Sequence, residues 1–203
     1  MGRERALKEY RRRRDFGRTA EPEGEDAAAT PDGEPSFVVQ IHDATAMHFD
    51  FRLEVDGVLR SWAVPKGPSA DPHDKRLAMP TEDHPLEYRD FEGVIESGEY
   101  GAGTVIVWDE GTYRNLSEDR AGREIPFAEA LDHGHASFRL DGKKLHGGYA
   151  LTRVRSGDDG GREAWLLVKH ADRSAHGNGG TDPHRARSTR SGRTLGQVSG
   201  SAS

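Results

Sequence analysis

The 203-residue chain contains no cysteine and no long apolar run, and these absences exclude several classes of protein. Without cysteine there is no disulfide, no thiolate ligand and no cysteine nucleophile, so any metal must be held by histidine, aspartate or glutamate. No segment approaches the ~20 apolar residues that a membrane-spanning helix needs, and no apolar stretch follows the charged start. We therefore expect a cytoplasmic monomer with no membrane partner.

The composition indicates that part of the chain lies outside a packed core, because 33% of the residues are hydrophobic and 32% are charged. Residues 1–20 carry eight basic and three acidic side chains, whereas residues 21–35 carry six acidic and no basic ones. Proline and glycine interrupt the second stretch. We predict that residues 1–35 form a flexible arm that starts with a short helix over 4–13 and contributes substrate contacts.

Dense apolar patterning begins at residue 36 and ends near residue 170, and most of it alternates with a period of two. This pattern predicts nine strands, over residues 37–42, 47–55, 58–64, 76–79, 91–95, 104–108, 136–140, 148–154 and 164–169. Asp56-Gly57 predicts a tight hairpin, and Asp141-Gly142 a second one. The fold class is therefore mainly β, a small closed or nearly closed antiparallel β-barrel with one short helix over residues 126–131.

From residue 171 onward the chain consists mostly of Gly, Ser, Arg, Thr and His, with almost no large apolar residue. Burial cannot offset the entropy lost on ordering such a segment. Three parts follow: the arm over 1–35, the barrel domain over 36–170 and a disordered tail over 171–203. The five arginines of the tail would attract a polyanion weakly, although a merely solubilising tail is the simpler interpretation.

Residues 47–53 place an unusual row of side chains on one strand face. Their alternation puts His48, Asp50 and Arg52 on one side, with successive members roughly 6–7 Å apart, and four apolar residues on the other. His42 ends the preceding strand, and the short connection permits it to return beside His48. Two imidazoles and one carboxylate suit Mn²⁺, Fe²⁺ or Zn²⁺. By pattern alone, an exposed strand face with ordinary charged side chains is an equally good interpretation.

Further candidates lie on loops. In the segment 82–88 a proline fixes the loop, and His84 and Tyr88 offer hydrogen-bond donors at the mouth of a site. Lys66 and Arg76 stand at loop–strand junctions, where each could bind phosphate. Taken singly, a hydrogen-bonding loop histidine and solvated surface cations are the commoner explanations.

Several linked motifs resemble those of one protein family. They are Gln40-Ile41-His42-Asp43, His48-Phe49-Asp50-Phe51-Arg52-Leu53-Glu54, Ser61-Trp62-Ala63-Val64-Pro65-Lys66-Gly67-Pro68, Glu82-Asp83-His84-Pro85-Leu86-Glu87-Tyr88, Asp90-Phe91-Glu92-Gly93 and Gly98-Glu99-Tyr100-Gly101-Ala102-Gly103-Thr104-Val105. Over residues 36–170 the chain resembles the 3′-phosphoesterase domain of bacterial DNA ligase D. The arm is also similar, through Tyr10 and Arg14-Asp15-Phe16. Ligase D joins this module to polymerase and ligase domains that this sequence lacks, so the resemblance is to a stand-alone form.

The resemblance implies a role for each candidate residue. Manganese, or another divalent transition metal, would be held by His42, His48 and Asp50. The implied catalytic groups at the phosphate are Arg52, His84 and Tyr88. The further implied residues are Arg14 and Arg76 as phosphate contacts, and Asp15, Glu21, Gln40, Glu82 and Lys66 as supports for substrate or ligands.

The resemblance also implies an activity, the metal-dependent healing of DNA 3′ ends in repair by non-homologous end joining. A phosphodiesterase step would remove a 3′-terminal ribonucleoside, and a phosphomonoesterase step would then convert the remaining 3′-phosphate to a hydroxyl. The implied partners are DNA or DNA/RNA 3′ ends, such as a primer-template. Separate ligase, polymerase and end-joining proteins are implied as well.

Two other functions fit parts of the pattern. His48-x-Asp50 followed by a later histidine also occurs in iron-binding 2-oxoglutarate oxygenases, although His42 and the neighbouring cations fit that class poorly. The other alternative is a non-catalytic module that binds 3′ ends and recruits a polymerase or ligase. The intact set of candidate metal ligands and phosphate-site groups argues against this alternative.

Overall fold

The computed structural model describes residues 2–24, 33–157, 160–177 and 180–201. Parts of the predicted arm (25–32) and of the predicted tail (178–179 and 202–203) lie outside the described residues. The strands are β1 Ser36–Asp43, β2 Met47–Val55, β3 Val58–Val64, β4 Arg76–Pro80, β5 Gly93–Ile95, β6 Gly103–Asn115, β7 His135–Gly142, β8 His146–Arg155 and β9 Ala164–Lys169. All nine predicted strands are present. The largest difference is β6, which continues beyond the predicted end at residue 108.

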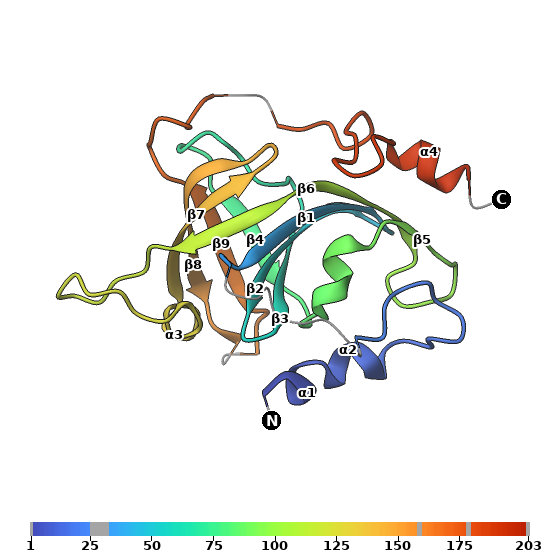
Figure 1. The fold of residues 1–203 in the computed structure, drawn as a ribbon, viewed down its shortest axis with the longest axis horizontal. Helices are drawn as coiled ribbons and strands as arrows, with labels where there is room; N and C mark the ends of the chain where they lie inside the picture. The colour runs from blue at the N-terminus through green and yellow to red at the C-terminus, as the bar shows by residue number, and fades with distance from the viewer. Residues whose placement is uncertain (1, 25–32, 158–159, 178–179, 202–203) are drawn as a thin grey trace.

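The strands form one antiparallel sheet that closes on itself (Figure 1). Their order is β1-β2-β3-β4-β9-β8-β7-β6-β5, and β1 also pairs with β6. Eight strands therefore make a closed barrel, while β5 is added beside β6 outside the ring. This confirms the predicted mainly β class and the closed barrel.

The helices are short. They are α1 Gly2–Ala6, α2 Lys8–Arg12, the 3₁₀ helix η1 Leu86–Asp90, α3 Phe127–Asp132 and α4 Leu195–Ser199. The predicted single helix corresponds to α3, and the predicted helix of the arm is divided into α1 and α2. None of the helices in the described ranges has the length and apolarity that a membrane crossing requires.

Two apolar clusters lie on opposite faces of the barrel wall. Alternation in β2 directs Phe49, Phe51 and Leu53 into the barrel, where they join the larger cluster. A smaller cluster lies on the outer face of β1, β3 and β6; its members are Tyr10, Val38, Leu59, Leu86, Tyr88, Phe91, Ile95, Val105 and Val107. The N-terminal segment and η1 cover this outer face. The polar face of β2 therefore points outward, toward that cover.

Residues 2–24 of the N-terminal segment pack against the barrel, which differs from the flexible arm predicted for residues 1–35. Leu7 and Tyr10 are fully buried, and the Tyr10 hydroxyl donates to the Pro22 carbonyl oxygen at 2.6 Å. The prediction followed the high charge and the Pro and Gly content of residues 1–35. It did not recognise that two apolar side chains three residues apart can both be buried, and that Tyr10 joins the outer cluster.

The C-terminal segment is also ordered over its described residues, unlike the predicted disordered tail. The backbone N–H of Thr189 donates to the Val107 carbonyl oxygen at 2.9 Å, and Leu195 and Val198 of α4 are buried. Thr194 and Gln197 form a capping box at the start of α4. Composition alone did not indicate that Leu195 and Val198, three residues apart, together with a helix cap, would dock this segment.

The two predicted hairpins differ in outcome. Asp56 and Gly57 both have positive φ values, 50° and 80°, so they form the tight β2–β3 turn as expected. Asp141 and Gly142 instead belong to β7, and the turn follows them. Glycine is required at position 142 because a Cβ atom there would lie 2.5 Å from the Asp109 carboxylate and 2.6 Å from the Phe37 ring.

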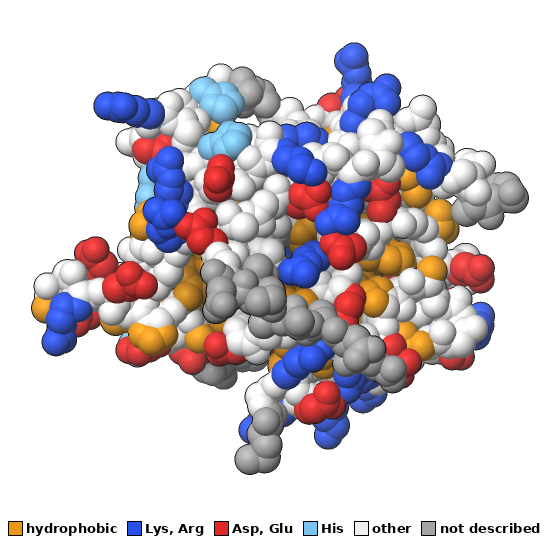
Figure 2. Space-filling view, in the orientation of Figure 1, with side chains coloured by type: hydrophobic (Ala, Val, Ile, Leu, Met, Phe, Trp, Pro, Cys, Tyr) orange, Lys and Arg blue, Asp and Glu red, His pale blue; other side chains and the backbone are white. Residues whose placement is uncertain are grey.

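On the face of the molecule drawn in Figure 2, Lys and Arg side chains are interspersed with Asp and Glu. The formal net charge of the chain is −6. Non-specific nucleic-acid affinity depends on neutralising phosphates with lysine and arginine. Any affinity of this protein for a polyanion therefore depends on local groups of cations.

Docking of the C-terminal segment predicts a difference between two leucine variants. Leu195→Ala should lower the free energy of unfolding of the full chain by about 2–3 kcal/mol, because this side chain is only 4% exposed. Leu116→Ala is the matched control, since Leu116 is 42% exposed and its loss should change stability by less than about 0.5 kcal/mol. Urea denaturation measures both, and equal effects would show that α4 is not packed in solution.

Candidate active site

The register of β1 against β2 brings the predicted metal ligands together. His42 stands directly opposite His48, and Gln40 opposite Asp50. Opposite residues of an antiparallel pair share a face, and so do residues two apart on one strand. His42, His48 and Asp50 therefore lie on the same patch of the outer barrel wall.

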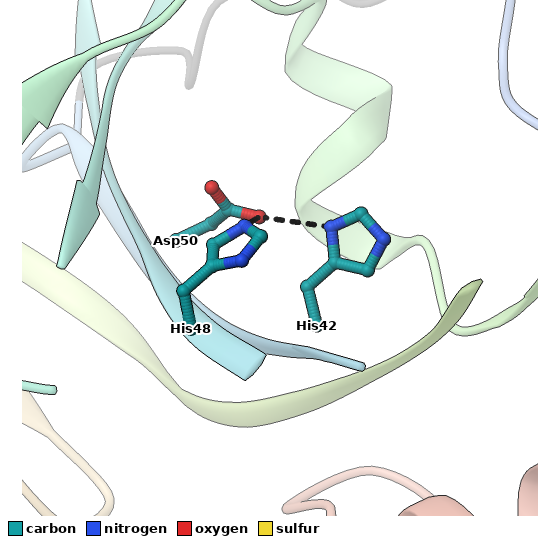
Figure 3. A group of neighbouring side chains, drawn as sticks. All are labelled: His42, His48 and Asp50. Atoms are coloured by element: carbon teal, nitrogen blue, oxygen red, sulfur yellow. Dashed lines mark ion pairs between the residues drawn. The ribbon is translucent and has the colours of Figure 1, made fainter. Parts of the chain in front are cut away.

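The three side chains face one another at short distances (Figure 3). The Oδ2 atom of Asp50 lies 3.6 Å from Nδ1 of His42 and 3.5 Å from Nε2 of His48. One ligand atom from each residue lies within 4.8 Å of the other two. This is the spacing of a group that could hold one ion.

Hydrogen bonds on the far side of each ring set which nitrogen carries the proton. His42 Nε2 lies 2.8 Å from the Gly101 carbonyl oxygen, and His48 Nδ1 lies 2.9 Å from that of Ala46. A carbonyl only accepts, so these two nitrogens are the donors, and in each neutral ring the nitrogen that faces Asp50 carries the lone pair. Backbone contacts of this kind commonly orient metal-binding histidines. The donor set therefore fits a divalent transition metal.

The charge state of Asp50 also suits a cation. Burial opposes ionisation, but Arg52 and both histidines outweigh it and hold the pKa of Asp50 well below its usual range. Burial likewise lowers the pKa of His48, yet the contact that its protonated ring makes with the negatively charged Asp50 raises the pKa overall. The Asp50 carboxylate thus attracts a positive charge to this point, whether a proton or a metal ion.

Arg52 is fixed beside this group and is only 2% exposed. Its Nε donates to Gln40 Oε1 at 2.8 Å, its Nη1 donates to Ser61 Oγ at 2.9 Å, and its Nη2 lies 3.2 Å from Asp50 Oδ2. Gln40 is itself held through its Nε2 by the carbonyl oxygens of Tyr88 and Phe91. A buried guanidinium is thereby held rigidly at the edge of the cluster.

His84 contacts Arg52 through one ring nitrogen and leaves the other free. Its Nδ1 lies 3.0 Å from Arg52 Nη1 and 2.8 Å from the Glu82 carbonyl oxygen, and Nε2 has no protein partner within the described ranges. Burial lowers the pKa of His84 well below its usual range, and the charges of Arg52 and Arg14 lower it further. At neutral pH this imidazole is therefore uncharged.

Tyr88 contacts Glu21 through its hydroxyl and Arg52 through its ring. Its hydroxyl donates to Glu21 Oε1 at 2.9 Å, and the Arg52 guanidinium lies 4.9 Å from the centre of its ring. Burial and the nearby Glu21 raise the pKa of Tyr88 well above its usual range, so the phenol keeps its proton. Arg14 also reaches Glu21, at 3.0 Å, and Glu82, at 3.2 Å. The N-terminal segment thus supplies part of the wall.

These side chains line one pocket of about 320 Å³. The predicted residues that it brings together are Arg14, Glu21, His42, His48, Asp50, Arg52, Glu82, His84 and Tyr88. Gln40 lies behind Arg52 and is fully buried. Lys66 and Arg76 line a different pocket, and Asp15 caps the backbone N–H of Gly17. The structure does not bring these last three side chains into the pocket.

Sequence reasoning missed three residues at the site. Gly101 orients His42 through its carbonyl group, Ser61 accepts from Arg52, and Tyr100 lines the pocket. Ser61 had a usable signal: a two-residue turn at Asp56-Gly57 pairs Val55 with Val58, and the same register places Ser61 opposite Arg52. Nothing in the sequence locates the 97–102 hairpin, which carries Gly101 and Tyr100, relative to β1.

Sequence comparison relates this chain to proteins of known families. Residues 40–153 match the DNA ligase D 3′-phosphoesterase domain. The multifunctional non-homologous end joining protein LigD of Pseudomonas aeruginosa is 50% identical over 169 residues, which are 83% of this chain and 19% of that protein. The multifunctional non-homologous end joining DNA repair protein LigD of Mycobacterium tuberculosis is 47% identical over 148 residues, 73% of this chain and 18% of that protein.

A third relative gives the same result. The LigD protein of Mycolicibacterium smegmatis is 42% identical over 166 residues, which are 82% of this chain and 21% of that protein. The chain thus spans about a fifth of the length of these relatives. The family match covers more than half of the chain and includes the metal-ligand candidates, Arg52, His84 and Tyr88. This chain belongs to the DNA ligase D 3′-phosphoesterase domain family.

Proposed function

We propose that this protein is a metal-dependent phosphoesterase that heals DNA 3′ ends during non-homologous end joining. It would remove a 3′-terminal ribonucleoside and then the 3′-phosphate that remains. The observation that carries the proposal is the convergence of two imidazole lone pairs and the Asp50 carboxylate beside the buried Arg52 guanidinium. The family match supports ester hydrolysis, and the names of the relatives support a role in end joining.

His42, His48 and Asp50 are the proposed ligands of a divalent transition metal, which imidazole and carboxylate donors suit. Mn²⁺ is the proposed metal because the family resemblance implies it. When bound, such an ion polarises a non-bridging phosphoryl oxygen. Gly101 and Ala46 keep the two rings turned so that their lone pairs face the ligand position. The Asp50 carboxylate would offset one of the two positive charges of such an ion.

Arg52 and His84 are the proposed groups that contact the phosphate. Gln40 and Ser61 hold the Arg52 guanidinium in place, so it can neutralise charge on the phosphoryl oxygens with little reorganisation. His84 presents its free Nε2 to the same pocket. Because this imidazole is neutral before substrate binds, it can donate to a phosphoryl or leaving oxygen only as the tautomer with the proton on Nε2, in which Nδ1 accepts from Arg52 Nη1. The charge of a bound phosphate would favour protonation of both nitrogens.

The remaining pocket residues are proposed to position these groups. Tyr88 packs its ring against Arg52 and donates its hydroxyl to Glu21. Glu21 and Glu82 both pair with Arg14. Lys66 and Arg76 are proposed to contact the nucleic acid outside the reacting phosphate, because they line a separate pocket. Asp15 is proposed to support the substrate indirectly, because its carboxylate accepts from the backbone N–H of Gly17 and so helps to fix the N-terminal segment.

A direct assay tests the activity. A primer-template whose primer ends in one ribonucleotide is incubated with the protein and Mn²⁺, and the products are resolved over time. We expect a 3′-phosphate product to appear first and a 3′-hydroxyl product to follow, and a chelator should abolish both. Binding of the ends without turnover in any of several divalent metals would instead indicate a non-catalytic module.

Replacement of Asp50 tests the metal site. Asp50→Asn keeps the shape but removes the anionic ligand, so Mn²⁺ affinity should fall by more than the ~10- to 100-fold typical of losing a partner that orients a ligand. Asp141→Asn is the matched control, because this carboxylate is 82% exposed on β7. Calorimetric titration with Mn²⁺ measures both. Undiminished binding by Asp50→Asn would refute the ligand assignment.

Replacement of His84 tests the phosphate contact. His84→Ala should reduce kcat by roughly 10²- to 10⁴-fold, the usual contribution of a positioned acid–base group, while Mn²⁺ binding persists. His146→Ala removes a histidine that is 52% exposed and should leave kcat unchanged. Near-normal turnover of 3′-phosphate ends by His84→Ala would show that this imidazole has no part in the reaction.

A further inference from the structure

One exposed aromatic ring stands at the mouth of the proposed active site. Tyr100 is 44% exposed, and it is one of four large hydrophobic side chains that are exposed in the described part of the chain. The other three are Leu77, Leu116 and Val154, and none of them lines this pocket. An exposed tyrosine is therefore placed where a substrate would enter.

The Tyr100 ring is held in a defined orientation. Its hydroxyl contacts both Arg13 and Glu82, and it lies 3.3 Å from Glu82 Oε2. The Arg13 and Arg14 guanidinium groups lie 4.7 Å and 5.5 Å from the ring centre, both within the range of a cation–π contact. Although its hydroxyl and two guanidinium groups hold it, Tyr100 is still 44% exposed and therefore keeps free surface for another flat group.

The position of Tyr100 in the chain ties it to the metal ligands. It lies in the hairpin between β5 and β6, and the next residue, Gly101, holds His42 through its carbonyl group. The same pocket contains Asp50 and Arg52, where the phosphate is proposed to lie. A nucleotide bound at that phosphate would bring a base to the pocket mouth.

Stacking on aromatic side chains is the usual way in which proteins hold unpaired bases without reading their sequence. We propose that Tyr100 is a stacking platform for a nucleobase next to the reacting phosphate, and that it makes the enzyme prefer ends that carry this base over abasic ends. This inference rests on the proposed function.

The test compares strands with and without bases in the presence of Mn²⁺. One pair carries a 3′-phosphate with either a base or an abasic sugar at the terminal position. A second pair ends in a ribonucleoside or in a bare ribose, which separates a base on the leaving side from a base on the retained side. In at least one of the two pairs, the KM of the natural protein should be about five- to tenfold lower for the strand that carries the base. This factor corresponds to the lower end of the free-energy range for stacking one base on an aromatic side chain.

Variants assign this preference to the ring. Tyr100→Ala should bring the ratio of KM values close to one, whereas Tyr100→Phe, which keeps the ring, should retain the preference. Val154→Ala, an exposed apolar side chain on β8, is the control and should retain it too. A natural protein that treats the base and abasic strands of both pairs alike would overturn the proposal, as would a Tyr100→Ala variant with an unchanged ratio.

A failure of the proposed function would be visible separately. In that case no strand is cleaved by the natural protein, and the same strands are compared by equilibrium binding with fluorescence anisotropy. Tighter binding of the base-containing strand that is lost in Tyr100→Ala would still support stacking. Equal binding of all strands by the natural protein would overturn it.

Discussion

The burial of the Arg52 guanidinium is the constraint on which the site depends. A charge with 2% exposure is tolerated only if it is paired and hydrogen-bonded, and Asp50, Gln40, Ser61 and His84 provide those contacts. Each partner comes from a different position on β1, β2, β3 or the loop before η1. The same contacts that stabilise the charge therefore fix the geometry of the proposed phosphate site.

The barrel determines where such a site can be built. Its interior is filled by apolar side chains, so a polar cluster must lie on the outer wall. An open outer wall would leave the cluster in water, where charges interact weakly. The N-terminal segment and η1 cover it, and Arg14 and Glu21 enter the pocket from that cover. Segments that flank the core in the sequence thus complete the site.

Much of this arrangement could be predicted from particular residues. Alternation placed His48, Asp50 and Arg52 on one face of β2, and the Asp56-Gly57 turn set the pairing of β2 with β3. The rest depends on tertiary contacts that no local pattern encodes. Composition could not show that Tyr10 anchors the arm or that Leu195 docks α4, and it could not separate Arg76 from the pocket that holds Arg14.

The alternation of β2 has an evolutionary consequence. Odd-numbered positions from Phe49 to Val55 fill the barrel, while His48, Asp50 and Arg52 face the pocket. Substitutions on the two sides of this nine-residue strand therefore have separate effects, one on packing and the other on the pocket. Apolar residues of similar volume can replace one another in the interior without altering the pocket face, and the pocket face can change without rebuilding the core.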